Sequence, residues 1–393
     1  MSEQLKNLDT KKAQGLSLKV GIAGLALFVA ALFFEKTRSQ AFESYLMGFT
    51  FIASFGLGSL FLLLLQNVTG GRWGISIRRL LEAAAGTLPY TALMLIPVFL
   101  GMSTLYEWAR PEAAHDHVIQ LKAAYLNVPA FILRSVIFFA IWTFIVNRLL
   151  TWTRAEDRGD ALASKKFGMF SAPCIVIYAL TMTFASFDWL MSIEPHWFST
   201  MFGVRYGAGA ALGSLALAVI VLNRIKDIEP IKSVVRFQLC SDLGNLMLAF
   251  TMFWAYVSFS EFLIIWCANL PEERFWYADR LQGGWQVLSL ALIISHFFIP
   301  FLFLMNRSIK KRLDRLAKLA VFILFARFLD FGWTVIPSFH AADGMRIHLL
   351  DVTTFFGLFG IWFFVYLRGL SSRPLIAALS PRMKEVLGDA HHD

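Results

Sequence analysis

The sequence predicts an all-α, polytopic membrane protein with about ten transmembrane helices. Of its 393 residues, 57% are hydrophobic and only 16% are charged, and the mean hydropathy is +0.60. A soluble protein would carry about a quarter charged residues. The apolar residues gather in runs of roughly 20, the length that a helix needs to cross a bilayer. These runs leave no room for a separate soluble domain.

Ten apolar runs define the predicted spans. The first follows a polar tail, residues 1–17, and leads straight into Glu35 and Lys36 without a small-residue cleavage site. It is therefore predicted to be a retained helix and not a signal peptide. A second polar tail covers 369–393, and the whole of 1–393 is interpreted as one integral membrane domain. The predicted spans are 18–34, 43–66, 84–106, 129–150, 167–190, 199–223, 236–266, 284–305, 316–338 and 350–368.

Lysine and arginine residues predict the orientation. Most of the 36 lie in the N-terminal tail, the even-numbered loops and the C-terminal tail, and they account for the net charge of +9 without nucleic acid. Because cytoplasmic loops carry the excess of these residues, both termini are predicted to be cytoplasmic. The loops 107–128 and 267–283 then face outward and carry more acids than bases. They are the expected docking surfaces for partners outside the membrane.

The cysteines and histidines predict that the chain binds no metal and no haem of its own. Cys174, Cys240 and Cys267 are isolated, no CxxC occurs, and each is predicted to be a small buried apolar residue. A b-type haem in a membrane needs axial ligands inside the bilayer, commonly histidines. His296 is the one histidine well inside a predicted span.

The stretch from Ser186 to Thr200 joins two predicted spans and is unusually rich in polar and aromatic residues. Its first acid, Asp188, lies inside the end of the apolar run, about a turn and a half deeper than Glu194. Because a charge at the bilayer centre costs roughly 2.5–3.5 kcal/mol on insertion scales, we interpret Asp188 as functional. The other motif residues have two interpretations, a functional site or an interfacial turn with tryptophans at headgroup depth. They are Trp189, Glu194, Pro195, His196 and Trp197.

Ionisable residues inside the spans form the candidate site. Intramembrane charges commonly face the bundle interior, pair with one another and mark a pathway. With the predicted orientation, most lie toward the outer half, His296 lies near mid-span, and Glu82 and Asp242 lie near the inner face. We predict a proton path along Asp188, Glu261, His296, Arg327 and Asp330, with Glu82 and Asp242 at its inner end.

Structural alternatives stay open for several of these residues. Arg327 and Asp330 are three residues apart, so they share a helix face and are able to form a salt bridge that only locks helices together. Arg134 and Arg205 lie near span ends, where snorkelling to the interface is expected. His296 has the alternative of a hydrogen-bonded core histidine.

A weak internal repeat divides the chain. The fourth and eighth spans both end in Asn-Arg, and the fifth and ninth carry Asp188 and Asp330 near their outer ends. Parallel repeats of this kind are a known membrane architecture. The repeat predicts a first four-helix bundle in 43–190 and a second in 199–338, with peripheral helices at 18–34 and 350–368.

Two motifs carry a resemblance to a known family. The segment SFDWLMSIEPHWFSTMFG, residues 186–203, resembles the signature of the F-type membrane subunit of alternative complex III. That complex is the bacterial quinol oxidoreductase that passes electrons to cytochrome c or another acceptor. Arg327-Phe328-Leu329-Asp330, with Trp333 and Pro337, is similar to a later motif of the same family. The resemblance implies a fold related to the NrfD and polysulfide-reductase membrane subunits, located in the bacterial inner membrane.

The resemblance also implies a function and partners. The F-type subunit is a cofactor-free membrane protein that contributes a transmembrane proton path in a respiratory or photosynthetic electron-transport chain, and it is not catalytic alone. Its implied partners are a sister C-type membrane subunit, a B-type iron–sulfur subunit and multi-haem cytochrome c subunits. These would carry the haem c, the iron–sulfur clusters and the quinol or menaquinol site, usually placed in the C-type subunit. Two alternatives stay open: a quinol-binding, C-type protein of the same complex, and an independent secondary transporter.

The distribution of basic residues gives a testable topology. Reporter fusions at Asp393 and in the loop around His115 are expected to report opposite sides of the membrane, with Asp393 in the cytoplasm. Activity of a cytoplasmic reporter at both positions would overturn the orientation and the depth assigned to every intramembrane acid.

Overall fold

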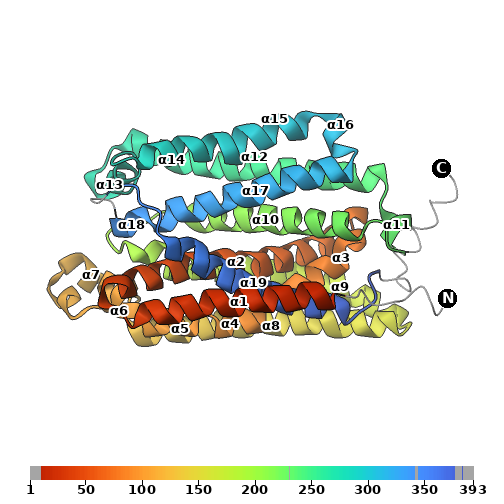
Figure 1. Ribbon diagram of the computed structural model, residues 1–393, viewed down its shortest axis with the longest axis horizontal. Helices are drawn as coiled ribbons and strands as arrows, with labels where there is room; N and C mark the ends of the chain where they lie inside the picture. The colour runs from red at the N-terminus through yellow and green to blue at the C-terminus, as the bar shows by residue number, and fades with distance from the viewer. Residues whose placement is uncertain (1–9, 230, 341–343, 377–382, 384–393) are drawn as a thin grey trace.

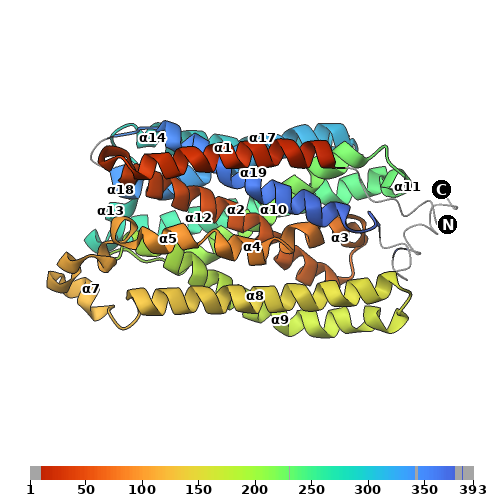
Figure 2. The same ribbon diagram turned by 60° about the horizontal axis from the view of Figure 1, so that its bottom comes forward.

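The fold is a bundle of long helices that lie side by side along the longest axis of the molecule (Figures 1 and 2). The computed structural model describes residues 10–229, 231–340, 344–376 and 383. Within these residues there is no β-strand, and ten helices or helix groups are long and apolar enough to cross a membrane. The predicted all-α fold with ten spans is confirmed.

Each predicted span coincides with one helix or with a chain of short helices. The spans are formed by α1 (Lys11–Leu32), α2 (Glu35–Thr69), α3 (Arg72–Ala85) with α4 (Leu88–Leu93) and α5 (Ile96–Leu100), α8 (Val128–Asp157), α9 (Ala161–Trp189), α10 (Phe202–Ile225), α12 (Phe237–Ala268), α14 (Trp285–Leu292) with η5 (Ile293–Phe298) and α15 (Ile299–Met305), α17 (Leu313–Val335) with α18 (Pro337–His340), and α19 (Leu349–Ser371). The connections hold α6 (Met102–Leu105), η2 (Glu107–Ala109), η3 (Pro111–His115), α7 (His117–Leu121), η4 (Met191–Ile193), α11 (Ile231–Val234), α13 (Pro271–Asp279) and α16 (Arg307–Lys310).

The connecting elements gather at two ends of the bundle. The short helices α7, α13 and α18 lie at one end, and α11 and α16 lie at the other, together with the start of α1 and the end of α19 (Figure 1). We call the end with α7 and α13 the outer end, after the predicted orientation, and the opposite one the inner end. Which side of the membrane each end faces stays a prediction.

Two helices form the centre of the molecule. Along most of their length α2 and α10 are buried, and they pack on each other as well as on α9 and α17. Close approach depends on small residues: a Cβ on Gly58 of α2 would lie 2.1 Å from the carbonyl oxygen of Ala210. Nearby, the Ser214 hydroxyl donates to the carbonyl of Phe55 at 2.9 Å. Small residues and interhelical hydrogen bonds replace the hydrophobic effect as the drive for packing in lipid. The division into two four-helix bundles stays a prediction.

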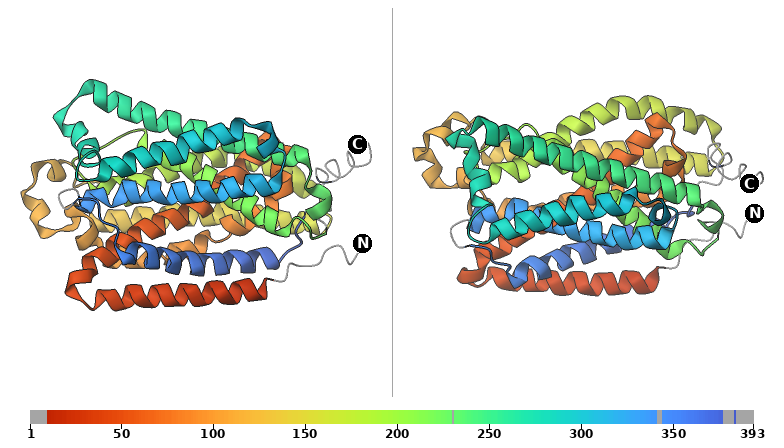
Figure 3. Two further views of the ribbon diagram at one scale, coloured as in Figure 1. Left: turned by 45° about the horizontal axis from the view of Figure 1, so that its top comes forward. Right: turned by 90° about the horizontal axis from the view of Figure 1, so that it is seen from above.

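The first and last spans are partners in packing. The helices α1 and α19 run side by side at the edge of the bundle (Figure 3). Glycines meet at their contact, where a Cβ on Gly24 would lie 2.5 Å from the Cα of Gly357 and one on Gly360 would lie 2.5 Å from the nitrogen of Gly21. Most apolar residues of α1 face the surface, and its contact with α19 holds it against the bundle.

The third span begins earlier than the sequence predicts and is broken. Its first helix, α3, starts at Arg72 instead of residue 84, and its residues from Gly74 to Ala85 are buried. The span then breaks before α4 and α5, which carry Pro89 and Pro97 in their first turns. Proline has no N–H to give to the preceding turn, so helices restart there.

One of the cysteine predictions is wrong. The structure buries Cys174 and Cys240, as expected, but Cys267 is exposed. It lies in the last turn of α12, where the helix reaches the outer end of the bundle.

Close packing of α2 on α10 is open to a direct test. Gly58→Leu is expected to destabilise the protein by about 1–3 kcal/mol, because the new side chain must push the α10 backbone away. The measurement is the thermal unfolding midpoint of the purified protein in detergent. Gly15→Leu in α1 is the matched control, because a Cβ at that position meets nothing within 4 Å. Equal midpoints for the two variants would contradict the packing argument.

Candidate functional site: a buried network of charged residues

Asp188, the acid that ends α9, is completely buried and paired with Arg134 of α8. The guanidinium donates from Nε to Oδ2 at 2.9 Å and from Nη2 to Oδ1 at 3.0 Å, and its third nitrogen donates to the carbonyl of Tyr125 at 2.8 Å. It also lies over the Tyr125 ring at 3.8 Å. A two-pronged pair of this kind is among the strongest polar contacts in proteins. The expectation that Arg134 snorkels to the interface is therefore wrong, because its guanidinium is turned into the protein.

The tryptophans of the motif are packed in the protein interior. Trp189 stacks on Phe139 at 5.6 Å between ring centroids and donates from its indole nitrogen to Ser135 at 3.2 Å. Trp197 stacks almost parallel on Trp276, with centroids 4.5 Å apart. Both side chains are fully buried. The interpretation of an interfacial turn with tryptophans at headgroup depth does not describe them.

The turn that follows Asp188 is fastened to the loop before α8 at the outer end. His196 Nε2 lies 3.0 Å from Asp116 Oδ2, and Lys122 Nζ donates to the carbonyl of Pro195 at 2.6 Å. The backbone N–H of Ile119 holds the pKa of Asp116 below its usual value, with a smaller contribution from His196. Partial burial lowers the pKa of Lys122. The polar motif residues thus hold the turn in place.

Arg280, which lies in a predicted loop, is the most deeply buried cation of the outer end. It donates to the carbonyls of Trp276 at 2.8 Å, Trp333 at 3.1 Å and Thr334 at 2.9 Å, and Glu194 Oε1 lies 3.4 Å away. The last carbonyls of a helix lack partners within it, so Arg280 completes the end of α17. Burial lowers the pKa of Arg280 to about 10. In the sequence, the aromatic run Phe275–Tyr277 shortly before Arg280 is the feature that indicates a packed segment in this loop.

A second network joins three helices. The guanidinium of Arg205 on α10 lies between Glu261 of α12, at 3.7 Å, and Asp330 of α17, at 3.8 Å. Arg327 donates directly to Asp330 one turn along the same helix. All four side chains are buried. The structure therefore brings together three of the predicted path residues, and it corrects the expectation that Arg205 snorkels.

Hydroxyl groups extend this network toward the outer end. Ser199, in the turn before α10, donates to Glu261 Oε1, and the Tyr277 hydroxyl donates to Oε2 at 3.3 Å. Tyr277 belongs to α13, which caps the bundle. The chain of contacts from Asp330 through Arg205 and Glu261 thus reaches the surface elements.

A small cavity lies inside the second network. Its volume is about 20 Å³, and Arg205, Arg327, Asp330 and Thr334 are among its lining residues. A cavity of roughly 10–15 Å³ or more with two to four polar partners holds a water molecule. Asp330 Oδ1 has no hydrogen-bond partner among the residues that the structure describes. Its 3.8 Å separation from Arg205 is longer than a direct hydrogen bond.

His296 is buried at mid-span without a hydrogen bond. It lies on η5, a π-helical turn, and its ring lies against that of Trp254, with centroids 3.8 Å apart and the planes tilted by 35°. Neither ring nitrogen has a hydrogen-bond partner in the described part of the chain. The described residues therefore offer no partner for the alternative of a hydrogen-bonded core histidine. Short π-helical turns inside α-helices are frequent at functional sites.

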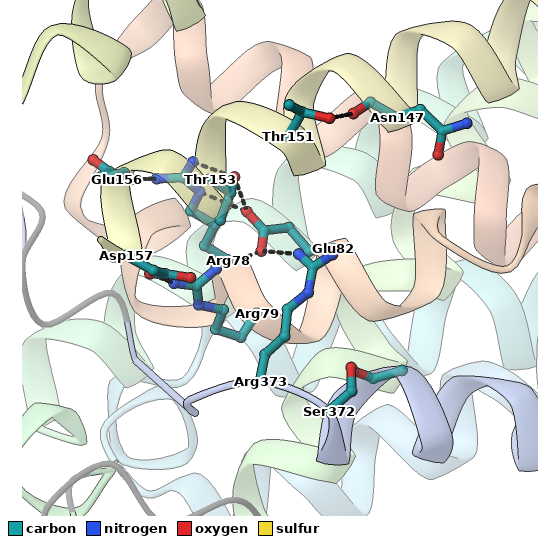
Figure 4. Close-up of polar contacts among 11 residues, drawn as sticks. Arg78, Arg79, Glu82, Asn147, Thr151, Thr153, Glu156, Asp157, Ser372 and Arg373 are labelled. Carbon is teal, nitrogen blue, oxygen red and sulfur yellow. Dashed lines mark hydrogen bonds and ion pairs between the residues drawn. The ribbon is translucent and has the colours of Figure 1, made fainter. Parts of the chain in front are cut away.

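Glu82 belongs to a separate ion-pair network at the inner end (Figure 4). Arg78 and Arg79 each donate to it at 2.8 Å, Thr153 donates at 2.8 Å, and Arg373, just beyond α19, lies 3.6 Å away. The same two helical arginines reach across to α8, where Arg78 pairs with Glu156 at 2.8 Å and Arg79 with Asp157. This network explains why α3 begins inside a charged stretch.

Asp242, the other predicted inner residue, stands apart from both networks. It is partly exposed near the start of α12, and Gln238 donates to it at 3.2 Å. With a rise of about 1.5 Å per residue, it lies roughly 28 Å along α12 from Glu261. The inner candidates therefore do not touch the outer ones.

Comparison with known proteins does not identify a family for this chain. No protein-family model matches the chain, and a search of curated proteins finds no match. The described residues contain no group of three or more His, Cys, Asp or Glu side chains that would hold a metal ion.

The Arg134–Asp188 pair predicts a specific pattern of stability. Arg134→Leu alone is expected to destabilise the protein by about 3–5 kcal/mol, because it strands a buried carboxylate. Adding Asp188→Asn is expected to recover most of that loss. The measurement is unfolding by sodium dodecyl sulfate, followed by circular dichroism, with exposed Arg274→Leu as the control. Additive losses in the double variant would show that the two residues do not act as a pair.

Proposed function

We propose that the chain is a cofactor-free membrane subunit of a quinol:acceptor oxidoreductase, and that its outer charge network conducts protons. The resemblance of residues 186–203 and of the Arg327 motif to the F-type subunit of alternative complex III supports the complex. The observation that supports the proton path is the water-sized cavity beside Asp330 Oδ1, which has no hydrogen-bond partner among the described residues. A water there joins the carboxylate to Arg205 and so to Glu261.

The chemistry of the network suits proton transfer. Burial favours the neutral form of a carboxyl group, and a neighbouring arginine favours the charged form. Asp330 is buried and lies beside both Arg205 and Arg327. The hydroxyls of Ser199 and Tyr277 then relay between Glu261 and the outer end. Glu82 and Asp242 stay predictions for the inner end of the path.

The proposed partners follow from the resemblance. They are a sister C-type membrane subunit that holds the quinol site, a B-type iron–sulfur subunit and multi-haem cytochrome c subunits, assembled in a bacterial inner membrane. The acidic loops around α7 and α13, at the outer end, are the proposed docking surface. Purification from native membranes tests this: co-migration with haem and iron–sulfur subunits supports it, and an isolated chain favours a transporter.

The helix breaks favour the oxidoreductase subunit over an independent transporter. Transporters of repeated architecture carry broken helices in corresponding positions of their two halves. Here the third span is broken into α3, α4 and α5, whereas the corresponding seventh span is the single 32-residue helix α12.

Substitutions in the assembled complex test the proton path. Asp330→Asn is expected to lower proton release per quinol oxidised and to slow turnover by about 100-fold, the low end for a positioned proton-transfer group. The measurement is quinol oxidation with proton release in proteoliposomes, for Asp330→Asn, Arg327→Met and the double variant. Asp314→Asn, an exposed aspartate on the same helix, is the control. A double variant that assembles normally with full turnover and unchanged proton yield would make the pair structural.

A further inference from the structure

A large apolar cavity lies beside the charge network and has no role in the proposed proton path. It lies between α12 and the α14–η5 segment, and its volume is about 580 Å³. Small-molecule sites in proteins have volumes of roughly 300–1,000 Å³ and are mostly apolar, with a few polar groups that fix orientation. Its walls include Trp254, Phe259, Phe297 and Trp333, and its polar residues include Arg205 and Ser289. The cavity thus has the size and composition of a ligand site.

Arg205 brings hydrogen-bond donors with only long contacts to this cavity. Its guanidinium has five N–H groups, and it is almost fully buried. Yet its nearest acceptors are Thr334 Oγ1 at 3.4 Å, Glu261 at 3.7 Å and Asp330 at 3.8 Å. These distances exceed the roughly 2.7–3.2 Å of an ordinary N–H···O bond. A ligand oxygen in the cavity would give the guanidinium of Arg205 an acceptor at ordinary hydrogen-bond distance.

Two further wall groups lack partners. The indole nitrogen of Trp254 and the hydroxyl of Ser258 have no hydrogen-bond partner among the described residues, and Trp254 is 4% exposed. Buried polar groups are almost always paired, so each exception calls for an unseen partner such as a water or a ligand. Both residues lie on the α12 side of the cavity.

The charges at the cavity select a neutral ligand. Arg205 and Arg327 are balanced by Glu261 and Asp330, all buried in the same network. An added phosphate or carboxylate would leave a net negative charge in the membrane interior, which is costly. The aromatic walls favour a flat ring, because aromatic rings pair with an energy beyond their burial. The chemistry is that of a neutral, flat ring with carbonyl oxygens.

The cavity also has an exit toward lipid. Three of its wall residues, Tyr256, Phe259 and Ile293, are 50% or more exposed on the surface of the bundle. They lie on α12 and η5, so the opening faces sideways, where lipid tails lie. A ligand with a long apolar tail is able to keep its ring inside and its tail outside.

We propose that the cavity between α12 and the α14–η5 segment binds an isoprenoid quinone, with the ring beside Arg205 and the tail in the lipid. The choice of a quinone among neutral ring lipids rests on the proposed function; the site itself rests on the cavity and its unpaired donors. The site is additional to the quinol site that the resemblance implies in the C-type subunit.

Photolabelling of the purified full chain tests this. The probe is a short-chain naphthoquinone that carries a photoreactive azide, with the chain in phosphatidylcholine nanodiscs and the labelled peptides identified by mass spectrometry. Label confined to 252–262 and 285–298, and suppressed by unlabelled naphthoquinone, supports the site. Label spread over all lipid-facing helices, or equally suppressed by added phospholipid, overturns it.

Variants separate specific binding from partition into the bilayer. Ala255→Phe fills the cavity and is expected to reduce labelling by about tenfold, whereas Ala140→Phe, on the exposed face of α8, leaves it unchanged. Trp254→Phe removes one N–H and keeps most of the ring, so it is expected to weaken naphthoquinone binding about fivefold without loss of folding. Unchanged labelling in both cavity variants, with unaltered thermal unfolding, overturns the proposal.

The proton path and the quinone site fail independently. Asp330→Asn is expected to keep the labelled peptides while it lowers proton release in the assembled complex. Specific labelling together with normal proton release in Asp330→Asn would remove the proton path and leave the quinone site standing. If Asp330→Asn lowers proton release but no specific labelling is found, the quinone site is removed and the proton path stands.

Discussion

The cost of holding charge in a hydrocarbon layer constrains every polar feature of this bundle. At the outer end the buried carboxylates Asp188, Glu261 and Asp330 and the partly buried Glu194 all lie within reach of an arginine. At the inner end the same rule gathers two helical arginines, Glu82 and the acids of α8 into one network. Because an unpaired ion inside a protein costs several kcal/mol, each pair that joins two helices favours one relative position of those helices.

Arg205 connects the two candidate functions of the chain. It lines the water-sized cavity beside Asp330 and also the large apolar cavity next to α12. Its contacts to both carboxylates are longer than ordinary hydrogen bonds, so its guanidinium is not fixed by a single partner. Both cavities therefore share one charged wall residue.

The central helices make these arrangements possible because they are held rigidly. Gly58 lets α2 touch the backbone of α10, and Arg280 ties the end of α17 to α13 and to the motif turn. Of the two central helices, α10 carries Arg205, which lies beside acids of α12 and α17. The large cavity is walled by α12 and η5, nearer the surface. The proposed ligand site thus has an exposed side at α12 and η5 and a polar end at Arg205.

The sequence by itself determined the ten spans and the residues that need an explanation, because hydrophobicity and unexpected charge are local properties of a run of about 20 residues. It also selected Glu261, Arg327 and Asp330, which the fold brings together. It did not determine which charges pair. Arg134 and Asp188 are 54 residues apart, so nothing local distinguishes an inward guanidinium from one that snorkels. The start of α3 at Arg72, the buried place of Arg280 and the unpartnered His296 likewise depend on distant helices. Burial of a charge is decided by the partner it meets, and only the tertiary structure supplies that partner.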